Sequence, residues 1–176
     1  MKIEKLVSLV FVSSFLLLSC GKKDRIEKRQ VNDFIVESVF KNDTLISSKS
    51  INKKTNTLEY DFAYNKKGLI TKVNEYYKNG KIKTISTLDK EPYYYLDIGY
   101  YLNGNIEHEG SISYIKQTKY RIGWWIFYNK NGTVNSMVEF DNDGKGNEWV
   151  VQKKEANAEE KKCSTTAQTI KLNNLK

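Results

Sequence analysis

A motif that recurs four times constrains the fold of this 176-residue chain more than any other feature. Each copy reads Tyr-x-x-x-Gly followed two places later by Ile or Val, and in three copies Asn precedes the glycine. Asn-Gly between apolar residues is the strongest short signal for a β-hairpin, because both residues tolerate positive φ. The motif therefore predicts strand, tight turn and strand, with the tyrosines packed laterally across neighbouring strands. The repeat residues are Tyr64 with Gly68, Tyr76 with Gly80, Tyr100 with Gly104, and Tyr128 with Gly132.

The spacing of these glycines indicates how the hairpins follow one another. Gly68 and Gly80 are 12 residues apart, and the next two intervals are 24 and 28 residues. Twelve residues hold one strand of ordinary length and one turn, so the 24-residue interval predicts an additional turn without glycine around 89–92. Successive hairpins of this kind form a meander in which each repeat packs against its neighbours.

These patterns predict an all-β fold, a single elongated and twisted antiparallel meander of β-hairpin repeats. The repeat domain is expected over residues 31–152, with the clearest repeats at about 60–151, and the role of residues 31–57 stays open. Residues 20–30 are expected to be a charged tether because they offer almost nothing to bury. Residues 153–176 form a polar tail, either disordered or a short helix.

The N-terminus predicts export. Lys2 and Lys5 precede an apolar run of 13 residues, which is too short to span a bilayer and suits a signal peptide over residues 1–19. The run ends in Leu-Leu-Ser-Cys, which resembles the bacterial lipobox, in which the signal helix is removed and the cysteine is acylated, for example with palmitate. This resemblance implies that Cys20 anchors the chain, since each buried methylene contributes about 0.8 kcal/mol.

The residue after the lipidated cysteine bears on localisation in the cell envelope. Gly21 stands there instead of aspartate, and by the usual sorting of lipoproteins this favours the outer membrane over the inner one. Cys163 is then left without an intrachain partner, so no structural disulfide is available.

The charge of the chain disfavours nucleic acid as a partner. The formal net charge is +8, but basic residues are scattered among acidic ones, and the sequence has no basic stripe interleaved with aromatics. Such a balance favours an acidic partner or an anionic headgroup surface, or simply gives a charged exterior.

Candidate catalytic residues are scarce. His108 is the single histidine, and it lies between Glu107 and Glu109 with no nucleophile nearby. We therefore expect His108 to be a solvated strand residue. Glu139, Asp141 and Asp143 imitate the first half of a calcium loop, but the twelfth position is an apolar valine, so an acidic hairpin loop explains them equally. We therefore expect no catalytic residue, no metal and no cofactor.

Aromatic residues are the remaining lead to function. A single-layer sheet leaves one face uncovered, so some of its aromatic side chains are available to contact protein or sugar rings. Tyr95, Trp124 and Trp125 are the candidate binding residues.

One segment carries a family resemblance. Gly123, Trp125, Tyr128, Asn131-Gly132 and Val134 resemble a unit of the MORN-repeat variant family, which includes the YwqK-like antitoxins. The resemblance covers about half of the chain and implies an elongated sheet that binds partners and does not catalyse reactions.

The function expected from these features is that of a non-catalytic, membrane-anchored lipoprotein. Its repeat sheet would bind a protein partner, as an antitoxin or immunity-type protein binds a toxin. The alternative is a structural lipoprotein of the envelope that binds glycan or lipid headgroups.

Overall fold

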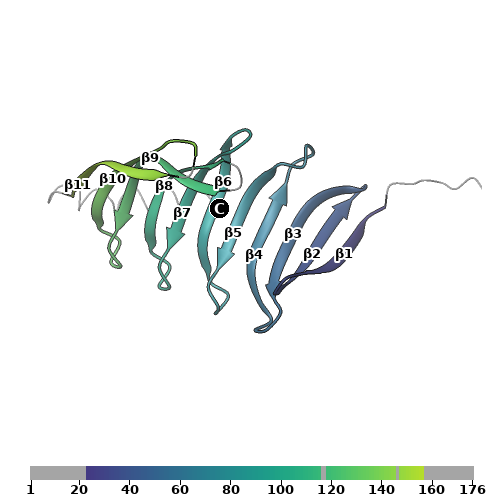
Figure 1. The fold of residues 1–176 in the computed structure, drawn as a ribbon. Helices are drawn as coiled ribbons and strands as arrows, with labels where there is room; N and C mark the ends of the chain where they lie inside the picture. Colours follow the sequence, from purple (N-terminus) through teal and green to yellow (C-terminus); the bar gives the residue numbers. More distant parts are fainter. Residues whose placement is uncertain (1–22, 116–117, 146, 157–176) are drawn as a thin grey trace, which may run out of the picture.

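The computed structural model describes residues 23–115, 118–145 and 147–156, and it shows one open antiparallel sheet of eleven strands (Figure 1). Each strand pairs with the next one in the chain, so the predicted all-β meander is confirmed. The strands are β1 (Arg25–Val31), β2 (Phe34–Lys41), β3 (Thr44–Asn52), β4 (Thr57–Tyr64), β5 (Ile70–Tyr76), β6 (Ile82–Lys90), β7 (Tyr94–Tyr100), β8 (Ile106–Ile115), β9 (Thr118–Tyr128), β10 (Val134–Asn142) and β11 (Glu148–Glu155).

The sheet extends further at both ends than the sequence predicted. Residues 25–30 were expected to belong to a tether, but together with Val31 they form β1, in which every residue is exposed. Backbone pairing to β2 holds this strand, together with the Arg25 guanidinium, which lies 4.0 Å from the Phe40 ring centroid and 2.6 Å from Asp43 Oδ1. At the other end, β11 runs to Glu155, three residues into the expected polar tail.

Residues 31–57, whose role was open, extend the same sheet as β2 and β3. The predicted signal peptide, Cys20 and Cys163 lie outside the described residues. The part of the chain that the structure describes includes no helix of the length and apolarity needed to cross a membrane.

All four motif copies have the same local structure. The tyrosine is the last residue of one strand, and the following Ile or Val is the first residue of the next. In the third copy, Gly104 has φ of 90°, its N–H donates to the Tyr101 carbonyl at 2.8 Å, and the Tyr101 N–H donates to the Asn105 carbonyl at 2.9 Å. This is a longer hairpin turn that closes with a glycine in the left-handed region.

The asparagine before the glycine therefore has another role than the one predicted. Among the described residues, the non-glycine positions with positive φ are Asn32, Asn42, Asp43 and Asn56, none of which belongs to a motif copy. In the Asn-Gly copies, the Asn Oδ1 atom accepts the backbone N–H two residues later at 3.1 Å. The residue is favoured as a side-chain acceptor inside the turn.

The copy that lacks this asparagine shows why the acceptor matters. Lys67 stands before Gly68 and has no side-chain acceptor, so the N–H of Leu69 needs another partner. Asn65, at the start of the turn, supplies the acceptor instead, with its Oδ1 atom 3.0 Å from the Leu69 nitrogen. The backbone N–H after the glycine is thus satisfied in all four turns, in three by the asparagine before the glycine and in one by Asn65.

The three Asn-Gly turns lie along one edge of the sheet, the lower edge in Figure 1. Successive turns of a meander alternate between edges, so the 24- and 28-residue intervals each correspond to two strands. Side chains join neighbouring turns: the Tyr77 hydroxyl donates to the Tyr100 carbonyl, and the Tyr101 hydroxyl donates to the Tyr128 carbonyl, both at 2.7 Å. At the opposite edge, the predicted glycine-free turn lies between β6 and β7.

Every motif hairpin also contains a β-bulge just after the turn. The tyrosine that ends one strand pairs with the Ile or Val that begins the next. The residue before the tyrosine pairs with the second residue after that Ile or Val, so one residue of the second strand is left without a partner in the ladder. In the third copy, Tyr100 pairs with Ile106 and Gly99 pairs with His108, so Glu107 is skipped. A shift of one residue exchanges the faces of all side chains that follow.

The hydrophobic core lies on one face of β7–β10. Its buried members are Tyr95, Ile112, Trp125, Val138 and Phe140. Three of the four repeat tyrosines reach the preceding strand: the hydroxyls of Tyr64, Tyr76 and Tyr128 lie within 3.0 Å of Ser48, Asp61 and Glu109.

Candidate functional site

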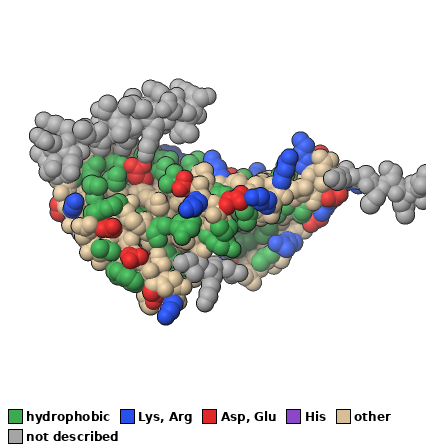
Figure 2. Space-filling model, turned by 90° about the horizontal axis from the view of Figure 1, so that it is seen from above, with side chains coloured by type: hydrophobic (Ala, Val, Ile, Leu, Met, Phe, Trp, Pro, Cys, Tyr) green, Lys and Arg blue, Asp and Glu red, His purple; other side chains and the backbone are tan. Residues whose placement is uncertain are grey.

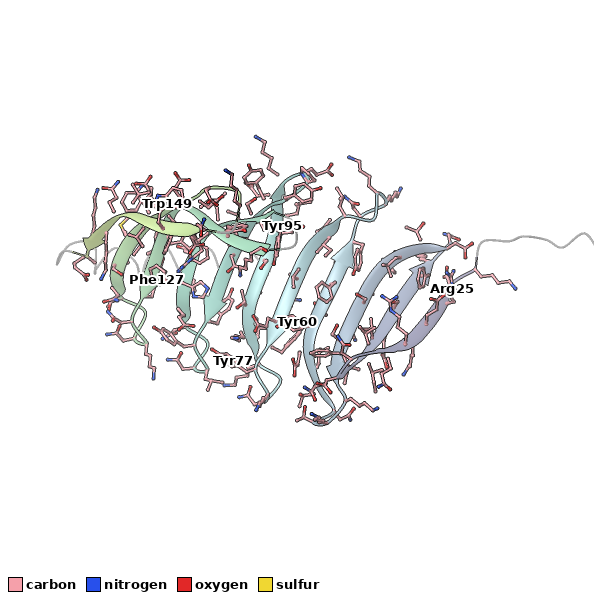
Figure 3. All side chains as sticks on the ribbon, in the orientation of Figure 1. Arg25, Tyr60, Tyr77, Tyr95, Phe127 and Trp149 are labelled. Atoms are coloured by element: carbon pink, nitrogen blue, oxygen red, sulfur yellow. The ribbon has the colours of Figure 1, made fainter. Side chains whose placement is uncertain are left out.

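Two hollows on the sheet mark the candidate site. The first, the aromatic groove, has a volume of about 980 Å³ and is lined mainly by Tyr60, Phe62, Val73, Tyr93, Tyr94, Tyr95 and Tyr114. The second, the polar pocket, has a volume of about 410 Å³ and is lined by Asp97, His108, Lys119, Arg121, Trp125, Phe127 and Glu148. Figure 3 labels Tyr60 and Tyr95 of the groove and Phe127 of the pocket, which lies toward the β11 end of the sheet.

Tyr95 organises the aromatic groove. It is 6% exposed, and its hydroxyl reaches across β6 to donate to the Ile70 carbonyl at 3.0 Å. The Tyr114 ring meets it edge-on, with the ring centroids 5.5 Å apart. Tyr93 and Tyr94 are 55% and 44% exposed, so they are the groove's accessible rings. In the view of Figure 2, hydrophobic side chains gather in patches between charged ones over the middle of the sheet.

Asp97 is the buried charge of the polar pocket. Its side chain is 1% exposed, it accepts a hydrogen bond from the Ser86 hydroxyl, and Lys119 Nζ lies 3.0 Å from Oδ2. Burial alone raises the pKa of Asp97, but the nearby His108 imidazole, Lys119 ammonium and Ser86 hydroxyl more than offset it. The pKa is therefore below its ordinary value, and the carboxylate is ionised at neutral pH.

His108 faces this carboxylate from β8. Its Nε2 atom is 3.7 Å from Asp97 Oδ2, and its side chain is 24% exposed, so the expectation of a solvated strand residue was wrong. The ring is tilted against Trp125 at 5.4 Å between centroids. Gly99 opposite makes room for it, since a Cβ at that position would overlap the imidazole.

Trp125 occupies a similar space over Gly110, where a Cβ would overlap the indole. The indole is 3% exposed and its Nε1–H donates to the Ser111 carbonyl at 3.0 Å. Glycine is therefore needed at both positions for close approach of a ring to the sheet backbone.

Arg121 and Glu148 form the outer wall of the polar pocket. Glu148 Oε1 lies 2.8 Å from Arg121 Nε and 2.5 Å from Nη2, and Oε2 accepts the Arg121 backbone N–H at 2.6 Å. The guanidinium also stacks 3.8 Å from the Phe140 ring centroid. These contacts join β9 to β11 and fix the orientation of the guanidinium.

The structure distributes the predicted binding residues over three locations. Tyr95 lies in the aromatic groove and Trp125 forms the floor of the polar pocket. Trp124 is 37% exposed and pairs with Glu139, on the opposite face from Trp125, with Lys154 Nζ 5.2 Å from its ring. A contribution of these residues to binding stays a prediction.

The acidic loop that resembles half of a calcium site is used for turn formation. Asp143 Oδ1 accepts backbone N–H groups from Lys145 and Asn147, at 2.7 and 3.1 Å. Over the described ranges, no three His, Cys, Asp or Glu side chains gather closely enough to bind a metal ion.

Sequence reasoning missed the exposed Tyr93 and Tyr94 and all five ionisable residues of the polar pocket. The consecutive tyrosines at 93–95 were a visible signal for the groove. The pocket gave no such signal, because its residues come from four strands and belong to no shared motif. Comparison with known proteins adds no assignment, since no family model and no curated protein matches this chain.

Proposed function

We propose that this chain is a non-catalytic, lipid-anchored protein of the cell envelope that binds a protein partner through the aromatic groove. The observation that carries the proposal is the groove itself, a wide apolar hollow with exposed tyrosines on a single-layer sheet. Tyrosine is enriched in the energetic centres of protein interfaces, because a large ring with a polar end is immobilised at little entropic cost.

The framework around the groove favours binding without large rearrangement. The strands that carry its rings are paired in the sheet. Side-chain contacts hold the rings themselves, such as the hydrogen bond from the Tyr95 hydroxyl to the Ile70 carbonyl across β6. A binding surface that is already ordered loses less conformational entropy when a partner arrives. The lipobox-like sequence at Cys20 and the resemblance to MORN-repeat variants support an anchored binding protein of the outer membrane, for which a toxin is one fitting partner.

The test is in-cell crosslinking of the full-length chain, followed by affinity purification and mass spectrometry. The test variant is Tyr93→Ser with Tyr94→Ser, which removes the two exposed groove rings. The matched control is Trp149→Ser with Val151→Ser, which replaces exposed apolar residues of β11, 45% and 54% exposed, outside the groove. Trp125 is unsuitable for this purpose because it is buried.

One abundant protein recovered with the native chain and with the control, but lost from the groove variant, supports the proposal. Recovery of no specific protein, or equal recovery from both variants, contradicts it. In that case the exposed tyrosine rings favour the second candidate, an envelope protein that binds glycan or lipid headgroups. Tryptophan fluorescence with polysaccharide and with anionic vesicles then tests that function.

A further inference from the structure

The polar pocket gathers more ionisable side chains than the sheet needs for its own pairing. Asp97 comes from β7, His108 from β8, Lys119 and Arg121 from β9, and Glu148 from β11. Their backbones are already paired in the sheet ladder, so the ion pairs are additional. Polar groups that converge on a hollow beside aromatic rings are typical of small-molecule sites.

The acceptors of this cluster are occupied within the protein. Asp97 takes hydrogen bonds from Ser86 and Lys119, one on each carboxylate oxygen. Glu148 takes two on Oε1 and one on Oε2, all from Arg121. The two carboxylates therefore serve to hold the two cations in place.

Donors are left over. A lysine ammonium has three N–H donors and an arginine guanidinium has five. Among the described residues, Lys119 uses one of its donors, to Asp97, and the Arg121 side chain bonds through Nε and Nη2. The Lys119 and Arg121 side chains are 42% and 40% exposed, so these donors are accessible from the mouth of the pocket.

The remaining wall of the pocket is aromatic. Phe127 stacks on Trp125, with ring centroids 6.2 Å apart, and both line the hollow beside His108. Aromatic walls of this kind contact the flat apolar face of a sugar or another ring. A ligand that suits the whole pocket combines an acceptor-rich group with a ring.

We propose that the polar pocket binds an oxyanion, either a carboxylate or a phosphate ester, that is carried on a ring. Lys119 and Arg121 donate to the oxyanion, His108 lies beside it, and Phe127 contacts the ring. Charge-assisted hydrogen bonds are about twice as strong as neutral ones, and here the donors are oriented before the ligand arrives. This site is separate from the aromatic groove and does not depend on protein binding there.

The single histidine of the chain gives a direct readout. In the full-length protein purified in detergent, the imidazole signals in NMR spectra belong to His108 without further assignment. Glucuronate, glucose 6-phosphate, glucose and inorganic phosphate are titrated at matched pH and ionic strength. Glucuronate and glucose differ at one carbon, so the pair isolates the effect of the carboxylate, and inorganic phosphate isolates the effect of the ring.

We expect both anionic sugars to shift the His108 signals with saturation, and glucose to leave them unchanged. Lys119→Gln keeps an amide donor for Asp97 but removes the cation, and it should weaken binding roughly ten- to one-hundred-fold. Lys130→Gln, in the exposed turn between β9 and β10, is the matched control and should bind normally. Circular dichroism verifies that both variants are folded.

Three results overturn the proposal. The first is a response to glucose equal to that to glucuronate, and the second is no response to either anionic sugar at millimolar concentration. The third is a folded Lys119→Gln variant with unchanged affinity. If inorganic phosphate binds as tightly as glucose 6-phosphate, the ring contact with Phe127 is refuted.

Discussion

Gly110→Ala tests the close approach of Trp125 to the sheet. In an open strand, this substitution stabilises by about 0.5–1 kcal/mol, because glycine loses more backbone entropy on folding. Here the new Cβ would overlap ring atoms of the buried indole, and the indole is held by its bond to the Ser111 carbonyl. Overpacking of this kind costs about 1–3 kcal/mol, so we expect a net loss of stability.

A double-mutant cycle separates this overlap from other effects of the methyl group. Trp125→Ala removes the ring and costs about 3–5 kcal/mol by itself. In that background the Gly110→Ala methyl has open space, so it should be neutral or stabilising by up to about 1 kcal/mol. The resulting coupling energy is about 1–4 kcal/mol. Trp124→Ala, on the opposite face of the same strand, is the control and should leave the cost of Gly110→Ala unchanged.

Hydrogen exchange followed by mass spectrometry is the suitable assay. In a meander, each strand contacts only its neighbours, so stability is a local property of the sheet and global unfolding averages over it. Peptides from β8 and β9 should exchange faster in Gly110→Ala than in the native chain, while those from β2 and β3 stay unchanged. Additive effects of Gly110→Ala and Trp125→Ala in β8 and β9 would refute the reasoning.

Three further predictions follow from particular side chains. The folded-state pKa of Asp97 is lowered, so its ionisation stabilises the fold above the ordinary aspartate value, and this contribution is lost as the pH falls through and below about 3.9. The stability difference between native chain and Asp97→Asn, measured by hydrogen exchange of β7 and β8 peptides relative to the intrinsic exchange rate at each pH, should be largest near neutral pH and shrink in that acid range; a constant difference would contradict it. Asn103→Ala removes the acceptor of one turn and should cost about 0.5–1.5 kcal/mol, seen as faster exchange at 101–105. Metabolic labelling with an alkyne analogue of palmitate should mark the native chain and Cys163→Ser but not Cys20→Ser, and a labelled Cys20→Ser would refute the lipobox interpretation.

The repeat architecture was readable from sequence because its signals are local. A glycine in the left-handed region and a tyrosine at the strand end lie within one motif, and neither depends on distant residues. The ends of the sheet were harder to predict. Arg25–Val31 buries nothing, so no apolar alternation marks β1, although backbone pairing and charged side chains are enough to hold it.

The polar pocket depends on the register between β7 and β8. Without a bulge, pairing outward from Tyr100 and Ile106 places Gly99 opposite Glu107, and it places His108 on the face away from Asp97. The bulge pairs Gly99 with His108 and so brings the imidazole to the same face as Asp97 and Tyr95. A tight two-residue turn at Asn103-Gly104 would pair Leu102 with Asn105 and would therefore also pair Gly99 with His108, so the bulge keeps the register that such a turn predicts. The different role of asparagine therefore leaves the strand register unchanged. The polar pocket was missed because its side chains meet only when β7, β8 and β9 are aligned residue by residue, and no single motif gives that alignment.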